Sequence, residues 1–82
     1  MKVRLFAALR DLAGANELEW AEDPPDVAAL LDGLAAKFGP QFERIAEAGS
    51  VVVDGRRADR SSVLAPDDEV AVLPPVSGGG PT

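Results

Sequence analysis

Alternating and helical hydrophobic patterns divide the chain into short strands arranged around one strong helix. In residues 2–9 every second side chain is apolar, which predicts a strand whose second half is buried on both faces. Residues 17–20 alternate cleanly and direct Trp20 inward. Residues 11–16 predict a turn between them, with one helical turn ended by Gly14. These segments together predict a hairpin with a long loop.

Residues 27–38 have the clearest helical pattern in the chain. Its apolar residues form a single stripe at helical spacing: Val27, Leu30, Leu31, Leu34 and Phe38. Asp26 is placed to cap the first turn, and Gly39 followed by Pro40 is typical of a helix end. Gly33 lies inside this helix, where its role is close packing or none.

The second half of the chain contains a shorter helix and three further strands. Residues 41–48 predict the helix. Residues 51–53 form a β-branched strand, and the turn beginning at Asp54 leads to a short charged strand at residues 56–58. Residues 69–73 predict the last strand. A right-handed crossover would place this strand beside the first one and parallel to it.

This order of elements predicts an α+β fold with one main helix packed on one face of a mixed sheet of four to five strands. It is the β-grasp, or ubiquitin-like, roll. We expect the folded domain to cover residues 1–76, because Pro74 and Pro75 stop regular pairing, and residues 77–82 to form a flexible Gly-rich tail.

Composition excludes many function classes. The 82 residues suffice for one small domain, and they include no Cys and no His, which removes disulfides, thiolate metal sites and the commonest general base. The net charge of −6 argues against nucleic acid and anionic membranes as partners. No apolar stretch approaches the ~20 residues that span a bilayer. We therefore expect a cytoplasmic protein with no metal site and no catalytic residues of its own.

The charged clusters favour structural interpretations. Residues 67–69 are all acidic but lack the alternating oxygen ligands and the glycine of a calcium loop, which indicates a solvated turn. Arg56, Arg57 and Arg60 form a basic patch without aromatic residues, which indicates a solvated edge strand. The tail has two interpretations that remain open: a frayed terminus, or a probe that threads a narrow channel in a partner, for which glycines are suited.

Two segments carry a resemblance to a known family. Residues 5–14 read LFAALRDLAG and residues 67–79 read DDEVAVLPPVSGG. An acidic turn, a short apolar strand, Pro-Pro-Val and Gly-Gly in this order resemble the MoaD/ThiS-type sulfur carriers, and among them the small subunit of molybdopterin synthase. The resemblance extends over residues 1–79, including the Pro-rich entry to the main helix.

The resemblance implies a non-catalytic carrier that binds no cofactor itself. In such families an E1-like adenylyltransferase uses ATP and Mg²⁺ to adenylate the C-terminal glycine, and a sulfur donor enzyme supplies the sulfur of a thiocarboxylate. The large subunit of molybdopterin synthase then receives the tail. Carried over to this sequence, Gly79 is the activated residue, with Gly80 as the second choice. The inserted tail comprises Pro74, Pro75, Val76, Ser77 and Gly78.

The family pattern ends at Gly-Gly, whereas this sequence continues Gly80-Pro81-Thr82. Gly79 is therefore in a peptide bond and has no free carboxylate to adenylate. We expect trimming after Gly79, or less favourably after Gly80, and the alternative is a member that has lost activation.

A partner surface is predicted beside the tail. If the main helix covers one face of the sheet, Phe6, Ala8, Ala71 and Leu73 share the opposite face, where the family also places hydrophobic partner contacts. Phe6 and Leu73 are the predicted interface residues, and the alternative is that they pack under a loop. Two further functions remain open: a sulfur carrier for thiamin, cysteine or another thio-metabolite, and a ubiquitin-like modifier or non-activated binding module.

Overall fold

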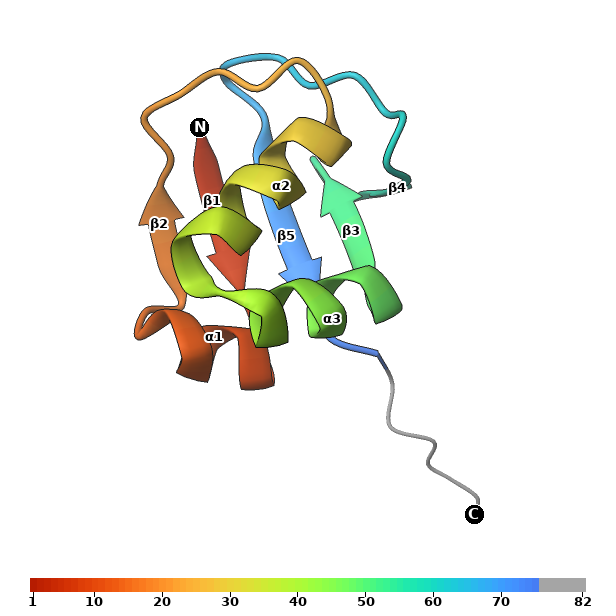
Figure 1. Cartoon of the computed structure of the whole chain (residues 1–82). Helices are drawn as coiled ribbons and strands as arrows, with labels where there is room; N and C mark the ends of the chain where they lie inside the picture. Colours follow the sequence, from red (N-terminus) through yellow and green to blue (C-terminus); the bar gives the residue numbers. More distant parts are fainter. Residues whose placement is uncertain (76–82) are drawn as a thin grey trace.

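The computed structural model describes residues 1–75, which form a mixed sheet with its helices packed against one face (Figure 1). The elements are β1 (Lys2–Leu5), α1 (Ala7–Ala13), β2 (Glu17–Glu19), α2 (Val27–Phe38), α3 (Pro40–Ala48), β3 (Ser50–Val53), β4 (Arg56–Ala58) and β5 (Glu69–Leu73). The strand order across the sheet is β2-β1-β5-β3-β4. β5 runs parallel to β1 and antiparallel to β3, which confirms the predicted return of the last strand.

The hydrophobic core lies between this sheet and the helices. The largest fully buried side chains come from β1, α1, α2, α3 and β5: Val3, Leu5, Leu9, Val27, Leu30, Leu34, Phe42, Val70 and Val72. α2 begins as predicted, because the Asp26 carboxylate accepts a hydrogen bond of 2.9 Å from the backbone N–H of Ala29. It ends at Gly39, whose positive φ of 102° favours glycine.

The predicted first strand is wrong beyond Leu5. The chain turns sharply at Ala7, which has a positive φ of 53°, and residues 7–13 form α1 instead of a continued strand. Leu9 is buried from this helix, so the core position expected of a strand residue is filled by a helical one. Gly14 closes α1 in the left-handed conformation, and its N–H bonds the Arg10 carbonyl at 2.9 Å. The one helical turn expected before Gly14 is therefore a longer helix, which replaces the long hairpin loop.

The other elements agree closely with the sequence pattern. α3 starts one residue earlier than predicted, with Pro40 in its first turn, where a missing N–H costs nothing. Phe42 of α3 is buried, and its ring centroid lies 5.2 Å from that of Phe38. The β3–β4 turn has positive φ at both Asp54 and Gly55, as the short hairpin turn requires.

Close packing explains the glycine inside α2. A β-carbon at Gly33 would lie 2.9 Å from the indole of Trp20, so the missing side chain lets the half-buried Trp20 lie against α2. The Lys37 ammonium is 5.9 Å from the centre of the same indole.

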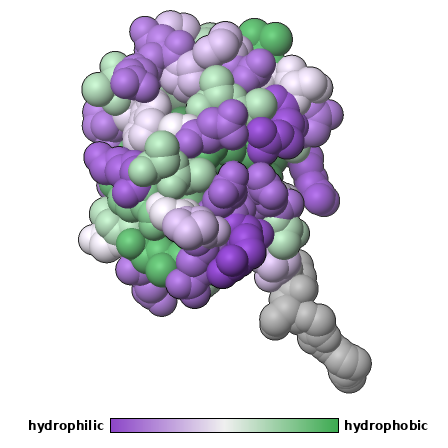
Figure 2. Space-filling model, viewed as in Figure 1, coloured by the Kyte–Doolittle hydropathy of each residue, from purple (hydrophilic) through white to green (hydrophobic). Residues whose placement is uncertain are grey.

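Figure 2 shows that hydrophilic residues cover much of the side of the molecule on which the helices lie. Within residues 1–75 no helix is both long enough and apolar enough to cross a bilayer.

Candidate functional site

The end of β5 delivers the C-terminal segment from the middle of the sheet. β5 lies between β1 and β3, and its carboxyl end emerges beside α3, where the chain leaves the folded body (Figure 1). The last registered pair joins Leu73 to Ser50. Pro74 and Pro75 then offer no N–H groups, so neither can extend the ladder. The regular pairing of β5 therefore ends at Leu73.

The activated glycines and most of the predicted inserted tail lie outside the described residues. Val76, Ser77, Gly78, Gly79 and Gly80 all follow Pro75, and their predicted roles stay predictions. Pro74 is half-buried and Pro75 exposed at the point of departure. The end of β5 and the surface around it are the parts of the candidate site that the structure describes.

The sheet face opposite the helices carries the alternate residues of the central strands. Arg4 of β1 is paired in register with Ala71 of β5, which in turn is paired with Val52 of β3. A shallow hollow of about 240 Å³ lies over these three residues and is bordered by Asp54 and Glu69. We call this surface the open face, and define its centre by Arg4, Val52 and Ala71.

Ionic contacts organise the rim of that hollow. The Arg4 guanidinium lies 3.6 Å from the Glu69 carboxylate, and both side chains are about half exposed. The Asp54 carboxylate accepts a 2.9 Å hydrogen bond from the Glu69 N–H, and the Asp54 N–H returns one to the Glu69 carbonyl. An exposed pair of this kind contributes little to folding, so its main effect is to set the charge pattern that a partner meets.

Phe6 lies at the edge of the open face. It follows β1 in an extended conformation, its ring is 5.8 Å from the Arg4 guanidinium carbon, and 38% of its surface is exposed. Leu73 is half-buried at the end of β5. The prediction that Ala8 shares this sheet face is wrong, because Ala8 lies in α1 rather than on a strand. The partner-binding role of Phe6 and Leu73 stays a prediction.

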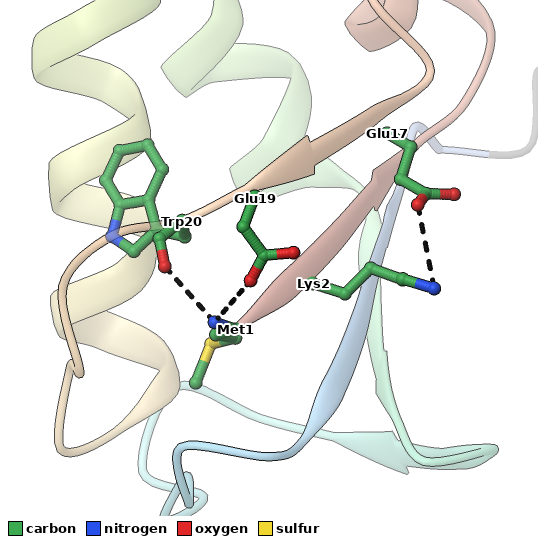
Figure 3. Close-up of polar contacts among 5 residues, drawn as sticks. All are labelled: Met1, Lys2, Glu17, Glu19 and Trp20. Atoms are coloured by element: carbon green, nitrogen blue, oxygen red, sulfur yellow. Dashed lines mark hydrogen bonds and ion pairs between the residues drawn. The ribbon is translucent and has the colours of Figure 1, made fainter.

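The β2 side of the sheet is polar (Figure 3). The Lys2 ammonium is 3.6 Å from the Glu17 carboxylate across the β1–β2 pair. The Met1 ammonium donates hydrogen bonds of 3.1 Å to the Glu19 carboxylate and to the Trp20 carbonyl. These contacts lie at the start of β1, at the opposite end of the sheet from Leu73.

The acidic and basic clusters noted in the sequence have structural partners. In the acidic turn, the Asp68 carboxylate accepts a 2.8 Å hydrogen bond from the Ala65 N–H, as a turn residue does. Arg60 lies beyond β4, where its guanidinium is 3.3 Å from Asp32 of α2 and 4.0 Å from Glu47 of α3. Over residues 1–75 no group of three His, Cys, Asp or Glu side chains is arranged to hold a metal ion.

Hydrogen bonding shifts the acidity of one further carboxyl. The Asp59 carboxylate accepts a 2.6 Å hydrogen bond from the Ser61 hydroxyl and one of 2.9 Å from the Ser61 N–H. These bonds favour the charged form and hold the pKa of Asp59 below its ordinary value. The carboxylate is exposed in the loop after β4 and both of these donors belong to Ser61, so the shift reflects local turn structure.

Gly49 is a residue that the sequence analysis did not single out. It joins α3 to β3, and a β-carbon there would overlap the carbonyl oxygen of Leu73. A hollow of about 460 Å³ between α2, α3 and the β3–β4 hairpin also touches Gly49. A lone glycine between a helical pattern and a β-branched strand is visible in the sequence. The pattern does not show why glycine is needed there, because the residue that it contacts, Leu73, is far away in the chain.

Comparisons with known proteins agree with this architecture. Residues 3–79 match the model of the ThiS family. The chain is 36% identical over 81 residues to the molybdopterin synthase sulfur carrier subunit of Escherichia coli, covering 96% of this chain and 99% of that one. It is 31% identical to the subunit of the same name from Arabidopsis thaliana, covering 96% and 82% of the two chains. Among solved structures, the small archaeal modifier protein 1 of Methanosarcina acetivorans superposes with a TM-score of 0.79 at 28% identity, covering 95% and 94%.

Proposed function

The chain belongs to the ThiS family, and from that premise we propose that it is the sulfur carrier subunit of a molybdopterin synthase. The observation that carries the proposal is the similarity to two molybdopterin synthase sulfur carrier subunits. It extends over 96% of this chain and reaches 36% identity. The geometry supports a carrier role, because Pro74 and Pro75 directly follow the central strand β5 and end its pairing at one end of the sheet. In a carrier, the partners bind the folded domain, and the segment that follows it carries the reacting group.

In this proposal the reacting group is the carboxylate of Gly79. A carboxylate is a poor acyl donor because oxide is a poor leaving group, so an activating E1-like partner first joins it to AMP from ATP and releases pyrophosphate. Hydrosulfide supplied by the donor enzyme then attacks the acyl adenylate: a C–S bond forms, the C–O bond to the phosphate breaks, AMP leaves, and the terminal glycine carries a thiocarboxylate. ATP and Mg²⁺ are bound by the activating partner, and the chain itself supplies neither a nucleophile nor a metal ligand.

Removal of the residues after Gly79 is a necessary part of the proposal. In the printed sequence Gly79 is followed by Gly80, Pro81 and Thr82, so its carboxyl carbon is in an amide. Hydrolysis of the Gly79–Gly80 bond gives the free carboxylate that adenylation requires. Pro81 lacks an N–H, but the nitrogen of the Gly79–Gly80 bond belongs to Gly80 and keeps its hydrogen. A protease therefore meets an ordinary Gly-Gly peptide bond.

The proposed partner surface is formed by Phe6 and Leu73. Both lie close in the fold to the departure point of the tail, and among residues 1–75 Phe6 is one of three large apolar side chains that are exposed. The neighbouring pair of Arg4 and Glu69 gives this surface charges of both signs. An apolar contact with a charged rim matches the usual anatomy of a protein interface, here with the large subunit and the activating enzyme.

Reconstitution with an E1-like activating enzyme tests the proposal. Chains ending at Gly79, at Gly78 and at Thr82 are each incubated with the enzyme, ATP and Mg²⁺, and pyrophosphate release is measured. We expect release only with the chain that ends at Gly79, because the matched chain ending at Gly78 is one residue too short to reach the adenylation centre. Equal release from all three chains, or activation of the full-length chain at Thr82, would refute the assignment of Gly79.

A protein modifier is the second candidate function. The superposition on a small archaeal modifier protein, at a TM-score of 0.79, is the observation that favours it. A modifier forms isopeptide bonds to lysine side chains of other proteins, whereas a sulfur carrier ends as a free thiocarboxylate. Mass spectrometry of tryptic peptides from the native host distinguishes them, because lysines that carry residues 61–79 appear only for the modifier: trypsin cleaves after Arg60, the last basic residue of the chain.

A further inference from the structure

Two backbone segments far apart in the chain meet where the C-terminal segment leaves the fold. Gly49 connects α3 to β3, and its N–H donates a 3.2 Å hydrogen bond to the Ala46 carbonyl. The next residue, Ser50, is the registered partner of Leu73 at the end of β5. The α3–β3 junction therefore lies directly against the last strand residue and the first proline.

The contact between these segments leaves no room for a side chain. A β-carbon on Gly49 would overlap the Leu73 carbonyl oxygen and would lie 2.9 Å from the carbonyl carbons of both Leu73 and Pro74. Gly49 has a φ of −93°, a value that any L-residue adopts, so space rather than backbone conformation demands glycine here. The atoms in the way belong to backbone, which cannot swing aside as a side chain does.

The other described glycines have different constraints. Gly14, Gly39 and Gly55 have positive φ and no atom within 4 Å of a built β-carbon, so they serve turns and helix ends. At Gly33 the nearest atoms belong to the side chain of Trp20, which can shift. Within residues 1–75, only Gly49 has backbone atoms of the departing strand as the neighbours of its missing side chain.

We propose that Gly49 is a positioning residue that fixes the direction in which the C-terminal segment leaves β5. Its bare backbone lets the α3–β3 junction press against Leu73 and Pro74, and the two prolines then extend the direction set there. This inference rests on the proposed carrier function for its consequence: the direction decides where the terminal glycine lies in the active site of a partner. A displacement of Leu73 and Pro74 moves the point from which the segment with the reacting group starts.

The decisive comparison is Gly49→Ala against Gly33→Ala, two variants that each add one methyl group at a crowded position. Amide NMR spectra of the full chain are recorded for both. We expect Gly49→Ala to shift the Leu73 resonance strongly, whereas Gly33→Ala shifts those around Trp20 and leaves the end of β5 unchanged. An unshifted Leu73 resonance in a folded Gly49→Ala protein would overturn the inference, whatever the function of the chain.

The kinetic consequence is measured on chains that end at Gly79, with an E1-like enzyme, ATP and Mg²⁺. Gly49→Ala displaces the reacting carboxylate and should lower kcat by about ten- to a hundredfold. KM should rise by a smaller factor, because the overlap reaches Leu73 of the docking surface but not Phe6. Gly33→Ala should keep the parent kcat. Equal loss in both variants would show general destabilisation and contradict a positioning role.

A second variant covers the case in which Gly49→Ala does not fold. Pro74→Gly leaves Gly49 in place and frees the same joint from the other side, at a residue that donates no hydrogen bond to the sheet because proline has no N–H. We expect a folded protein with a similarly lowered kcat, and full activity of Pro74→Gly would overturn the proposal. If the parent chain itself is not activated, the carrier function fails, and the NMR comparison still decides whether Gly49 sets the departure of the segment.

Discussion

The two faces of the sheet are made by alternate residues of the same strands, and they have opposite chemistry. On the covered face Val3 and Leu5 of β1 and Val72 of β5 are at most 1% exposed. On the open face Arg4 and Ala71, which alternate with them, line a shallow hollow with a charged rim. The residues of the covered face stabilise the fold, whereas those of the open face are not part of the core and can suit a binding partner.

This difference explains why two adjacent residues should respond differently to substitution. Leu5 is a fully buried residue at the end of β1, and Phe6 is the exposed residue that follows it. Loss of the first side chain leaves a cavity between the sheet and the helices. Loss of the second removes apolar surface that the isolated chain does not need.

The largest effect on stability is expected on the covered face. Leu5→Ala removes three buried carbons from a side chain that is 1% exposed, and should lower the free energy of unfolding by about 2–5 kcal/mol. Urea denaturation followed by circular dichroism measures the change. A loss below about 1 kcal/mol would mean that the covered face packs less tightly than the structure indicates.

The largest effect on binding is expected at Phe6. Phe6→Asp should weaken binding to the large subunit by about thirtyfold or more, because it places a charge in an apolar contact. The free energy of unfolding should change by less than about 1 kcal/mol, since an aspartate suits the position that caps α1. Isothermal titration calorimetry measures the affinity.

Val63→Asp is the matched control for this variant. Val63 is 82% exposed in the loop between β4 and β5. Val63→Asp, like Phe6→Asp, replaces an apolar side chain with a charged one. Its affinity should equal that of the parent chain. If Phe6→Asp binds as tightly as Val63→Asp, the open face near Phe6 is not the interface.

A smaller effect is expected at the entry to the covering helix. Asp26→Ala removes the carboxylate that accepts the Ala29 N–H at 2.9 Å, and should cost about 1 kcal/mol of stability. Asp26→Asn keeps an acceptor and should recover most of it. Urea denaturation of the three proteins compares them, and an unaffected Asp26→Ala chain would show that the packing of α2 alone holds the helix start.

The smallest effect is expected in the loop that belongs to neither face. Ser61→Ala removes the hydroxyl that holds the pKa of Asp59 below its ordinary value, so that pKa should rise. Because the pKa is depressed in the folded chain, the associated stabilisation is present above the ordinary Asp pKa and is lost as the pH falls through the lowered one. Carboxyl ¹³C NMR titration measures the shift, and an unchanged pKa would assign it to the backbone bonds.

The covering helix and the core it forms could be predicted because their signals are local. The stripe beginning at Val27, the cap at Asp26 and the stop at Gly39 each lie within one element, and all are confirmed. The segment after Leu5 was predicted wrongly, because alternation and helical spacing both bring Leu9 to the core. The choice of helix depends on the turn at Ala7, which the pattern does not reveal.

The candidate site could be predicted only in part. The proline stop at residues 74–75 and the exposure of Phe6 follow from the pattern and are present in the structure. The role of Gly49 could not be found in this way, because its constraint comes from Leu73, twenty-four positions further along the chain (73 − 49). A close approach between distant segments leaves only the absence of a side chain as its sequence signal.

Intact-protein mass spectrometry of the chain purified from its native host decides whether it is a sulfur carrier activated at Gly79. We expect a chain that ends at Gly79, with a fraction heavier by the exchange of one oxygen for sulfur. A mass that always includes Gly80, Pro81 and Thr82, with no sulfur exchange, would contradict a sulfur carrier that is activated at Gly79.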